Sequence, residues 1–138
     1  MTIQKRLLVI SAFSAAIAVA LGAMGAHFLK SKLETGLITE TNLQTFDTAV
    51  KYQMYHSLAI LFAALFFEKI KDKLISAAAY SFMAGIVLFS GSLYFLSTAG
   101  LLGLGNVKWL GPITPLGGLF FIAGWMLLGF SGFRNKTT

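Results

Sequence analysis

The amino-acid sequence predicts an all-α integral membrane protein: a four-transmembrane-helix bundle with a short amphipathic helix in the first, outer loop. Two observations predict this class. The 138 residues are 57% hydrophobic and only 12% charged, with a mean hydropathy of +0.77, whereas a soluble domain needs far more charge on its surface. Four segments are also long and apolar enough to cross a bilayer, which takes about 20 residues. We expect a single membrane domain over residues 1–138.

The four predicted spans cover residues 7–29, 52–67, 74–98 and 113–133. The first span has a basic start, but its apolar run is longer than the ~7–15 residues of a signal peptide, so we expect it to be retained. The second span is the shortest and needs its polar aromatic start, "YQMY", to reach full length. Only the loop after span one has room for structure of its own, and we expect residues 30–40 to be a true loop.

The second half of that loop carries a helical pattern. Its apolar residues share one helical face: Leu43, Phe46, Val50 and Met54. Thr41 precedes them with Gln44 three positions later, a capping-box signature, and Asp47 and Lys51 are spaced to form an ion pair on a helix. We therefore predict an amphipathic helix over residues 42–51, which either lies near the membrane surface or runs straight into span two.

Charge sets the expected orientation. The basic residues lie in short clusters between apolar spans, and this pattern favours a membrane partner and argues against nucleic acid, despite the net charge of +6. One side of the predicted topology carries Lys5, Arg6, Lys69, Lys71, Lys73, Arg134 and Lys136. The other carries Lys30, Lys32, Lys51 and Lys108 beside Glu34, Glu40 and Asp47. The positive-inside rule then places both termini in the cytoplasm.

Small residues predict where the helices touch, because helices in lipid associate through close backbone contact. Span one has small residues at four-residue spacing: Ser14, Ala18, Gly22 and Ala26. The other predicted contact points are Gly85 and Gly91 in span three and Gly117, with Gly118 and Gly124, in span four. Four helices bury little interior, so we also expect a homo-oligomer.

Polar residues are predicted to converge in one layer near the outer surface, because spans one and three end there and spans two and four begin there. The layer contains His27, Tyr52, Gln53, His56, Tyr94 and Thr114. Two interpretations remain open. The residues either anchor the helices and satisfy one another, or they form a site for a lipid headgroup or a quinone.

Metal, cofactor and catalytic roles find little support in the sequence. Two histidines with neither an acid nor a thiol nearby are a thin ligand set, so we expect no metal and no haem or other cofactor. The absence of cysteine excludes disulfides and thiol chemistry. No acid lies inside a span, and no nucleophile and base have a recognisable spacing, so we expect the protein not to be an enzyme.

Three functions fit these observations. The first is a non-enzymatic, homo-oligomeric protein that binds a lipid or other amphiphile in the polar layer. The second is a scaffold or assembly factor that docks a membrane-protein partner on residues 30–51. The third is an oligomeric channel or permease, whose pore-lining hydroxyls would be Ser81, Ser92, Thr98 and Thr114.

Four motifs resemble one family across essentially the whole chain. They are "GAMGAH" (22–27), "YQMYHSLAIL" (52–61), "LFSGSLYFL" (88–96) and "ITPLGGLFFIAGW" (113–125). Together they are similar to the bacterial domain-of-unknown-function family 423, also classed as uncharacterised protein family 0382. Met24 stands where an aromatic residue is expected, and Phe28 where glycine is expected. The resemblance implies a small bacterial inner-membrane protein with four spans and no established activity. It marks as motif positions His27, Tyr52, Gln53, His56, Gly91, Tyr94, Thr114, Pro115 and Gly117.

Overall fold

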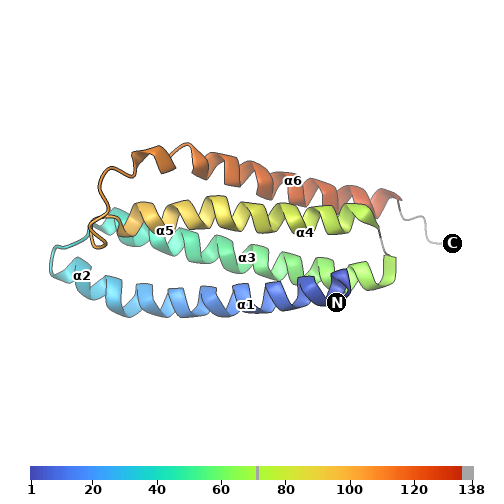
Figure 1. Ribbon diagram of the computed structural model, residues 1–138. Coiled ribbons are helices and arrows are strands. Elements are labelled where there is room, and N and C mark those ends of the chain that lie inside the picture. The colour runs from blue at the N-terminus through green and yellow to red at the C-terminus, as the bar shows by residue number, and fades with distance from the viewer. Residues whose placement is uncertain (71, 135–138) are drawn as a thin grey trace.

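Four long antiparallel helices make up the computed structural model, which describes residues 1–70 and 72–134 (Figure 1). The first comprises α1 (Ile3–Met24), a π-helical turn (Gly25–Leu29) and α2 (Lys30–Glu34). The second is α3 (Glu40–Ile70). The third comprises α4 (Lys73–Gly85), a second π-helical turn (Ile86–Ser90) and α5 (Gly91–Thr98). The fourth is α6 (Ile113–Arg134), preceded by a 3₁₀ turn (Lys108–Leu110).

These helices confirm the predicted all-α membrane class. The described residues contain four helical stretches long and apolar enough to cross a membrane: Ile3–Glu34, Glu40–Phe67, Lys73–Thr98 and Lys108–Phe133. The predicted limits of spans three and four are within a few residues of these. Lys71 and Lys136, which contribute to the predicted orientation, lie outside the described residues.

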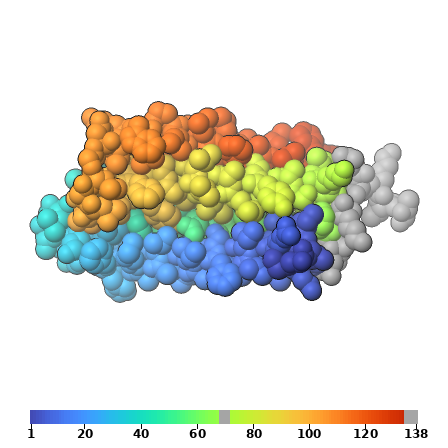
Figure 2. All heavy atoms as spheres, viewed as in Figure 1, coloured from blue at the N-terminus to red at the C-terminus, as the bar shows by residue number. Residues whose placement is uncertain are grey.

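The helices pack side by side in the order of the sequence. α1 packs along α3, α3 packs along the third helix, and the third helix packs along α6 (Figure 1). One face of the molecule shows the same order, with α6 along one edge and α1 along the other (Figure 2). The two edge helices are the least covered: 17% of the most apolar window is buried in each, against 39% in α3.

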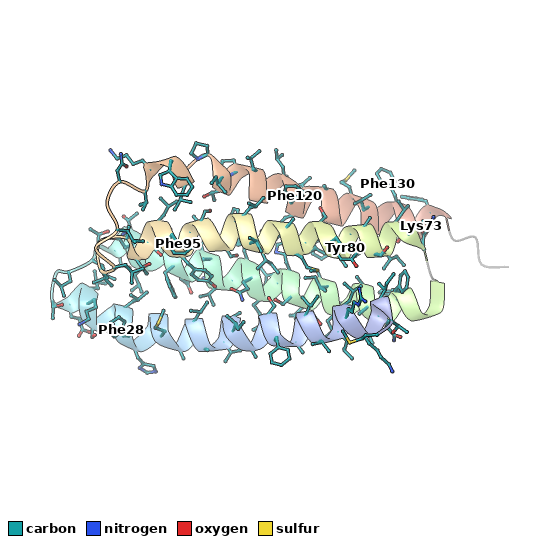
Figure 3. The ribbon with its side chains drawn as sticks, viewed as in Figure 1. Phe28, Lys73, Tyr80, Phe95, Phe120 and Phe130 are labelled. Carbon is teal, nitrogen blue, oxygen red and sulfur yellow. The ribbon has the colours of Figure 1, made fainter. Side chains whose placement is uncertain are left out.

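Large apolar side chains cover the outside of the helices, as expected for a surface in contact with lipid. Aromatic residues on several helices point away from their neighbours and are about half exposed (Figure 3). Among them are Phe28, Tyr80, Phe95, Phe120 and Phe130.

The first loop is much shorter than predicted. The expected loop over residues 30–40 is wrong, because α2 continues to Glu34 and only residues 35–39 separate it from α3. Gly36 ends the helix with a φ of 73°. The amide of Leu37 donates to the carbonyl of Lys32, and that of Gly36 donates to the carbonyl of Leu33. This pair of bonds is a Schellman motif, in which glycine adopts the left-handed backbone at little cost.

The predicted amphipathic helix is the start of α3, so the second of its two predicted placements is confirmed. The expected Thr41 cap is wrong. Thr39 Oγ1 accepts from the Asn42 amide at 3.2 Å, and Asn42 Oδ1 accepts from the Thr39 amide at 3.0 Å. These two reciprocal bonds resemble those of a capping box, and they begin at Thr39, two residues before the predicted cap. The predicted ion pair between Asp47 and Lys51 is confirmed at 2.6 Å.

This continuity moves the later residues of α3 deeper than predicted. His56 follows Glu40 by 16 residues, or about 24 Å of helix, and lies near the middle of α3. The predicted layer near the outer surface assumes that the helix begins with span two at residue 52, only four residues before His56. The segment proposed as a docking surface, residues 30–51, is mostly helix within the bundle.

The contact between α1 and α3 uses only part of the predicted small-residue stripe. Ala18 is buried, and a Cβ on Gly22 would lie 3.4 Å from Val50. Ala26 is exposed, so that prediction is wrong. Gly25 takes its place, and a Cβ there would lie 3.2 Å from the Phe46 ring. Four residues turn about 40° more than one full helical turn. Residues repeated strictly every four positions therefore move gradually off the contact face.

Two glycines let α4 and α6 pack closely through a reciprocal exchange of phenylalanine rings. A Cβ on Gly85 would lie 2.4 Å from the Phe121 ring, and a Cβ on Gly124 would lie 2.5 Å from the Phe82 ring. The same motif, Phe-x-x-Gly with a three-residue spacing, occurs on both antiparallel helices. Gly85 and Gly124 are therefore confirmed as contact points.

A third glycine contact joins α6 to the second π-helical turn. A Cβ on Gly117 would lie 2.3 Å from the backbone nitrogen of Phe89, so Gly117 is confirmed and accepts no side chain. Gly118 makes only an ordinary contact at 3.9 Å. The prediction for Gly91 is wrong, because a Cβ there would meet nothing closer than 4.0 Å, and that atom is Ile86 O of the preceding turn.

Candidate functional site

The predicted polar layer divides into separate groups on two adjacent faces of α3. Gln53 and Tyr94 meet between α1, α3 and α5, while His56 and Tyr52 face α4 and α6. Thr114 bonds elsewhere, to the third helix.

The first group is a chain of hydrogen bonds centred on Gln53, which is 5% exposed. The Tyr94 hydroxyl donates to Gln53 Oε1 at 2.7 Å, and Gln53 Nε2 donates to the Ser14 carbonyl at 2.9 Å. The Ser57 hydroxyl donates to the Gln53 carbonyl at 2.7 Å and lies 2.6 Å from Ser14 Oγ. Because the partners satisfy one another, this group joins three helices and leaves little free to bind a ligand.

His56 is the centre of the second group, and both its ring nitrogens have partners. Nδ1 lies 2.7 Å from the Tyr52 carbonyl, which can only accept, so Nδ1 carries the proton. Nε2 then accepts from the Trp125 indole Nε1–H at 3.2 Å. The imidazole is therefore fixed as one neutral tautomer between α3 and α6. In this arrangement neither nitrogen has a free lone pair for a metal or haem iron. The described residues contain no group of three or more His, Cys, Asp or Glu that could hold a metal.

Aromatic rings from three helices surround His56. Its ring stacks on Phe121 with centroids 3.5 Å apart and planes 10° apart, and Phe82 lies 5.4 Å away. Phe82 in turn meets Trp125 edge-on at 5.0 Å. Tyr52 extends the cluster, with its ring centroid 4.7 Å from that of Phe89. Gly85 and Gly124 make room for the two phenylalanines, so the reciprocal ring exchange between α4 and α6 forms the base of this cluster.

A cleft of about 550 Å³ lies over this cluster, between α3 and α6. We call it the aromatic cleft. It is lined by Tyr52, Tyr55, His56, Phe89, Gly118, Phe121, Ile122 and Trp125. Its size is within the range of ligand pockets, about 300–1,000 Å³. Because His56 and Trp125 lie near the middle of their helices, the cleft is deep in the apolar part of the molecule.

The hydroxyls predicted to line a pore are occupied within the protein. Ser92 and Thr114 lie 2.7 Å apart and bond to each other. Ser81 donates to the Phe120 carbonyl at 2.7 Å, and Thr98 donates to the Tyr94 carbonyl at 2.7 Å. These bonds tie helices or turns together, so the four hydroxyls are engaged by other described residues.

His27 does not join the other predicted site residues. It is exposed on the π-helical turn of the first helix, which is one edge of the bundle, while α6 is the other edge. No hydrogen bond joins its side chain to another described residue. The prediction of two histidines in one layer is therefore wrong. Its cause is that α1 continues past His27 as helix, so His27 does not mark the end of a span.

Sequence reasoning missed Trp125, the residue that fixes His56. One signal could have found it. Tryptophan usually lies at the membrane surface, whereas Trp125 is in the middle of span four, where its N–H needs an acceptor. His56, on another span, can accept this hydrogen bond as a neutral imidazole. Phe82 and Phe121 could have been found through their shared Phe-x-x-Gly spacing.

Known proteins similar to this chain place it in a family. The family described as "Protein of unknown function (DUF423)" matches residues 21–118. A UPF0382 membrane protein of Bacillus subtilis, YwdK, is 40% identical over 91% of this chain and 94% of its own. A UPF0382 membrane protein of Haemophilus influenzae is 36% identical over 97% of this chain and 98% of its own. A third, SAB0533 of Staphylococcus aureus, is 38% identical over 95% of this chain and 98% of its own. No solved structure matches. The reach and identity of these matches show that the chain belongs to the DUF423 family of bacterial UPF0382 membrane proteins.

Proposed function

We propose that this membrane protein binds, without transforming it, an amphiphile that carries a flat ring, such as a prenylated quinone, in the aromatic cleft. The observation that carries the proposal is the cleft itself: it has a volume of about 550 Å³, is walled by rings and lies near the middle of α3 and α6. A ligand there would enter sideways from the lipid.

The chemistry of the walls favours a ring over a simple acyl chain. Trp125, Tyr52 and Tyr55 are each 40–56% exposed at the cleft, and aromatic pairs gain about 0.5–1.5 kcal/mol beyond burial of their area. Neither the Tyr52 nor the Tyr55 hydroxyl has a hydrogen bond to another described residue, so both can donate to a carbonyl oxygen. His56, whose nitrogens are both engaged, holds Trp125 in place and makes no ligand bond of its own.

A rigid wall also supports binding over chemistry. The glycine contacts at Gly85 and Gly124 and the stack of His56 on Phe121 hold the rings before a ligand arrives, which lowers the entropic cost of binding. No carboxylate lines the cleft, and both ring nitrogens of His56 already have partners within the protein.

Tryptophan fluorescence tests the proposal directly, because the chain has two tryptophans and only Trp125 lines the cleft. In the Trp109→Phe variant, Trp125 is the single reporter. Decylubiquinone added to this variant in nanodiscs should quench the fluorescence with a saturable curve. In the Trp125→Phe variant, where Trp109 reports, quenching should rise linearly with quinone in the bilayer. Introducing Tyr52→Phe or Tyr55→Phe into the Trp109→Phe background should weaken saturable binding several-fold, and Tyr80→Phe, outside the cleft, should not.

Linear quenching of equal slope in both reporters would overturn the proposal. Saturable quenching that neither Tyr52→Phe nor Tyr55→Phe weakens would also overturn it, because the two hydroxyls would then have no part in binding.

We also propose that the protein is a homo-oligomer in the bacterial cytoplasmic membrane. Support comes from the sparse cover of α1 and α6, with 17% of each window buried. Native mass spectrometry from a mild detergent tests this: a discrete multimer is expected, and a monomer under every detergent condition would refute it.

The proposed orientation places both termini in the cytoplasm, on the basis of the basic residues flanking the spans. The lack of native cysteine allows a clean test. A membrane-impermeant maleimide applied to intact cells should label Leu104→Cys, in the loop before α6, and should label Thr2→Cys only after lysis. The reverse pattern would invert the assignment.

A further inference from the structure

We infer a second binding site, independent of the aromatic cleft: a groove that holds the zwitterionic headgroup of an ethanolamine lipid. The groove, of about 290 Å³, lies between the end of the first helix and the first turns of α3. We call it the amphipathic groove. It is lined by Gly22, Gly25, Ala26, Lys30, Glu40, Leu43, Gln44, Phe46, Asp47 and Val50.

The polarity of the groove changes along the helix axis as the polarity of a lipid does. Its deeper lining, toward the middle of the helices, comes from Gly22, Phe46 and Val50. Its outer lining comes from Lys30, near the end of the first helix, and Glu40, the first residue of α3. An acyl chain and glycerol backbone match the inner part, and a charged headgroup matches the rim.

The π-helical turn Gly25–Leu29 and its glycine shape the inner part of the groove. Gly25 has no side chain to fill the space beside Phe46, and Ala26, exposed on the same turn, adds only a methyl group. Larger residues at these positions would fill the groove. The space therefore depends on Gly25 making the contact with α3, where the small-residue pattern predicted Ala26.

The charges of the rim select the headgroup. Lys30 forms no ion pair with any described residue, and Glu40 has only a long contact of 3.5 Å from Gln44. Asp47 pairs through Oδ2 with Lys51, which leaves Oδ1 without a bond. One free cation beside two carboxylates complements a phosphate and an ammonium carried by one molecule. A purely anionic headgroup would meet both carboxylates, and a choline headgroup has no N–H to donate to them.

Native mass spectrometry with defined lipids tests the site. The full chain, stripped of co-purified lipid, is mixed with phosphatidylethanolamine, phosphatidylglycerol or phosphatidylcholine of the same acyl chains. We expect one phosphatidylethanolamine to bind at least several-fold more tightly than the other two. Glu40→Gln and Lys30→Gln should each weaken this binding about tenfold, as expected for the loss of one charge-assisted hydrogen bond. The matched controls Glu34→Gln and Lys108→Gln change charges at the same end of the molecule but outside the groove, and should have no effect.

A steric pair keeps the test independent of charge. Ala26→Trp fills the groove from an exposed position, whereas Ala23→Trp places the same side chain at an exposed position of α1 that does not line the groove. Only Ala26→Trp should abolish the tight binding. Equal binding of all three lipids, or equal effects of groove and control variants, would show ordinary surface lipid and overturn the inference. Neither result bears on quinone quenching at Trp125.

Discussion

The indole N–H of Trp125 donates to Nε2 of His56 at 3.2 Å and joins the middle of α6 to the middle of α3. Because the His56 Nδ1–H is engaged by the Tyr52 carbonyl, the imidazole can accept this bond without changing its tautomer. Both residues line the aromatic cleft, and the bond between them fixes the position of the indole ring.

Replacing Trp125 with Phe should destabilise the protein by about 1–2 kcal/mol, since the change removes the donor and leaves His56 Nε2 unpaired. Interhelical hydrogen bonds in membrane proteins average about 0.6 and reach about 1.7 kcal/mol, and lost ring contact with Phe82 adds to this. Unfolding in SDS mixed micelles, followed by circular dichroism, measures the effect. Trp109→Phe, at a residue 66% exposed, should stay within about 0.5 kcal/mol of the wild type. Equal losses in both variants would contradict the role of the bond.

Gly117→Ala should be among the most damaging small substitutions, at about 2–3 kcal/mol or more. The new Cβ would lie 2.3 Å from the Phe89 backbone nitrogen, an atom that cannot move aside as a side chain does. Gly129→Ala, on the same helix with nothing within 4 Å, is the matched control and should be neutral or slightly stabilising. The same unfolding assay decides, and similar stabilities for the two variants would show that α6 does not approach Phe89 this closely.

Ser90 and Ser92 should respond to alanine with opposite signs. The Ser90 hydroxyl is fully buried and has no hydrogen-bond partner among the described residues, so Ser90→Ala should stabilise the protein by about 1 kcal/mol. Ser92→Ala leaves Thr114 without its partner at 2.7 Å and should destabilise by about 1 kcal/mol. The difference in unfolding midpoint between the two variants is the measurement. A loss on Ser90→Ala would mean that this hydroxyl has a partner after all.

Gln53 and Tyr94 should be energetically coupled. In a double-mutant cycle of Gln53→Leu and Tyr94→Phe, the bond of 2.7 Å between them predicts a coupling energy of about 0.6–1.7 kcal/mol. Additive losses would indicate that the bond contributes nothing to stability. The pairing of Tyr94→Phe with Ser76→Ala, whose hydroxyl donates to the Lys73 carbonyl at the start of α4, provides a cycle expected to be additive.

Patterns within one helix were predicted well, and relations between helices less so. The Asp47–Lys51 pair and the amphipathic turns around Phe46 depend only on helical geometry, and both are confirmed. His27 was misplaced because a span was assumed to end where its apolar run ended, whereas α1 continues to Glu34 through a π-helical turn. His56 was placed too shallow for the related reason that α3 begins at Glu40.

The partner of His56 could not be derived from spacing alone. Which residue of span four lies opposite His56 depends on the closeness of α4 and α6, and this depends in turn on Gly85 and Gly124 accepting Phe121 and Phe82. A repeated Phe-x-x-Gly pattern indicates a close contact, but it gives no register between helices. The depth of one helix relative to another is set by these contacts and by the loops.

The order in which the helices pack bears on how the protein is made. A ribosome delivers the spans to the membrane one at a time, and here each span lies chiefly against the one delivered just before it. Since the most extensive contacts join consecutive spans, most of the assembly can proceed during synthesis, with short chain closures. The last span to arrive brings Trp125, so the aromatic cleft is completed only when translation is nearly finished.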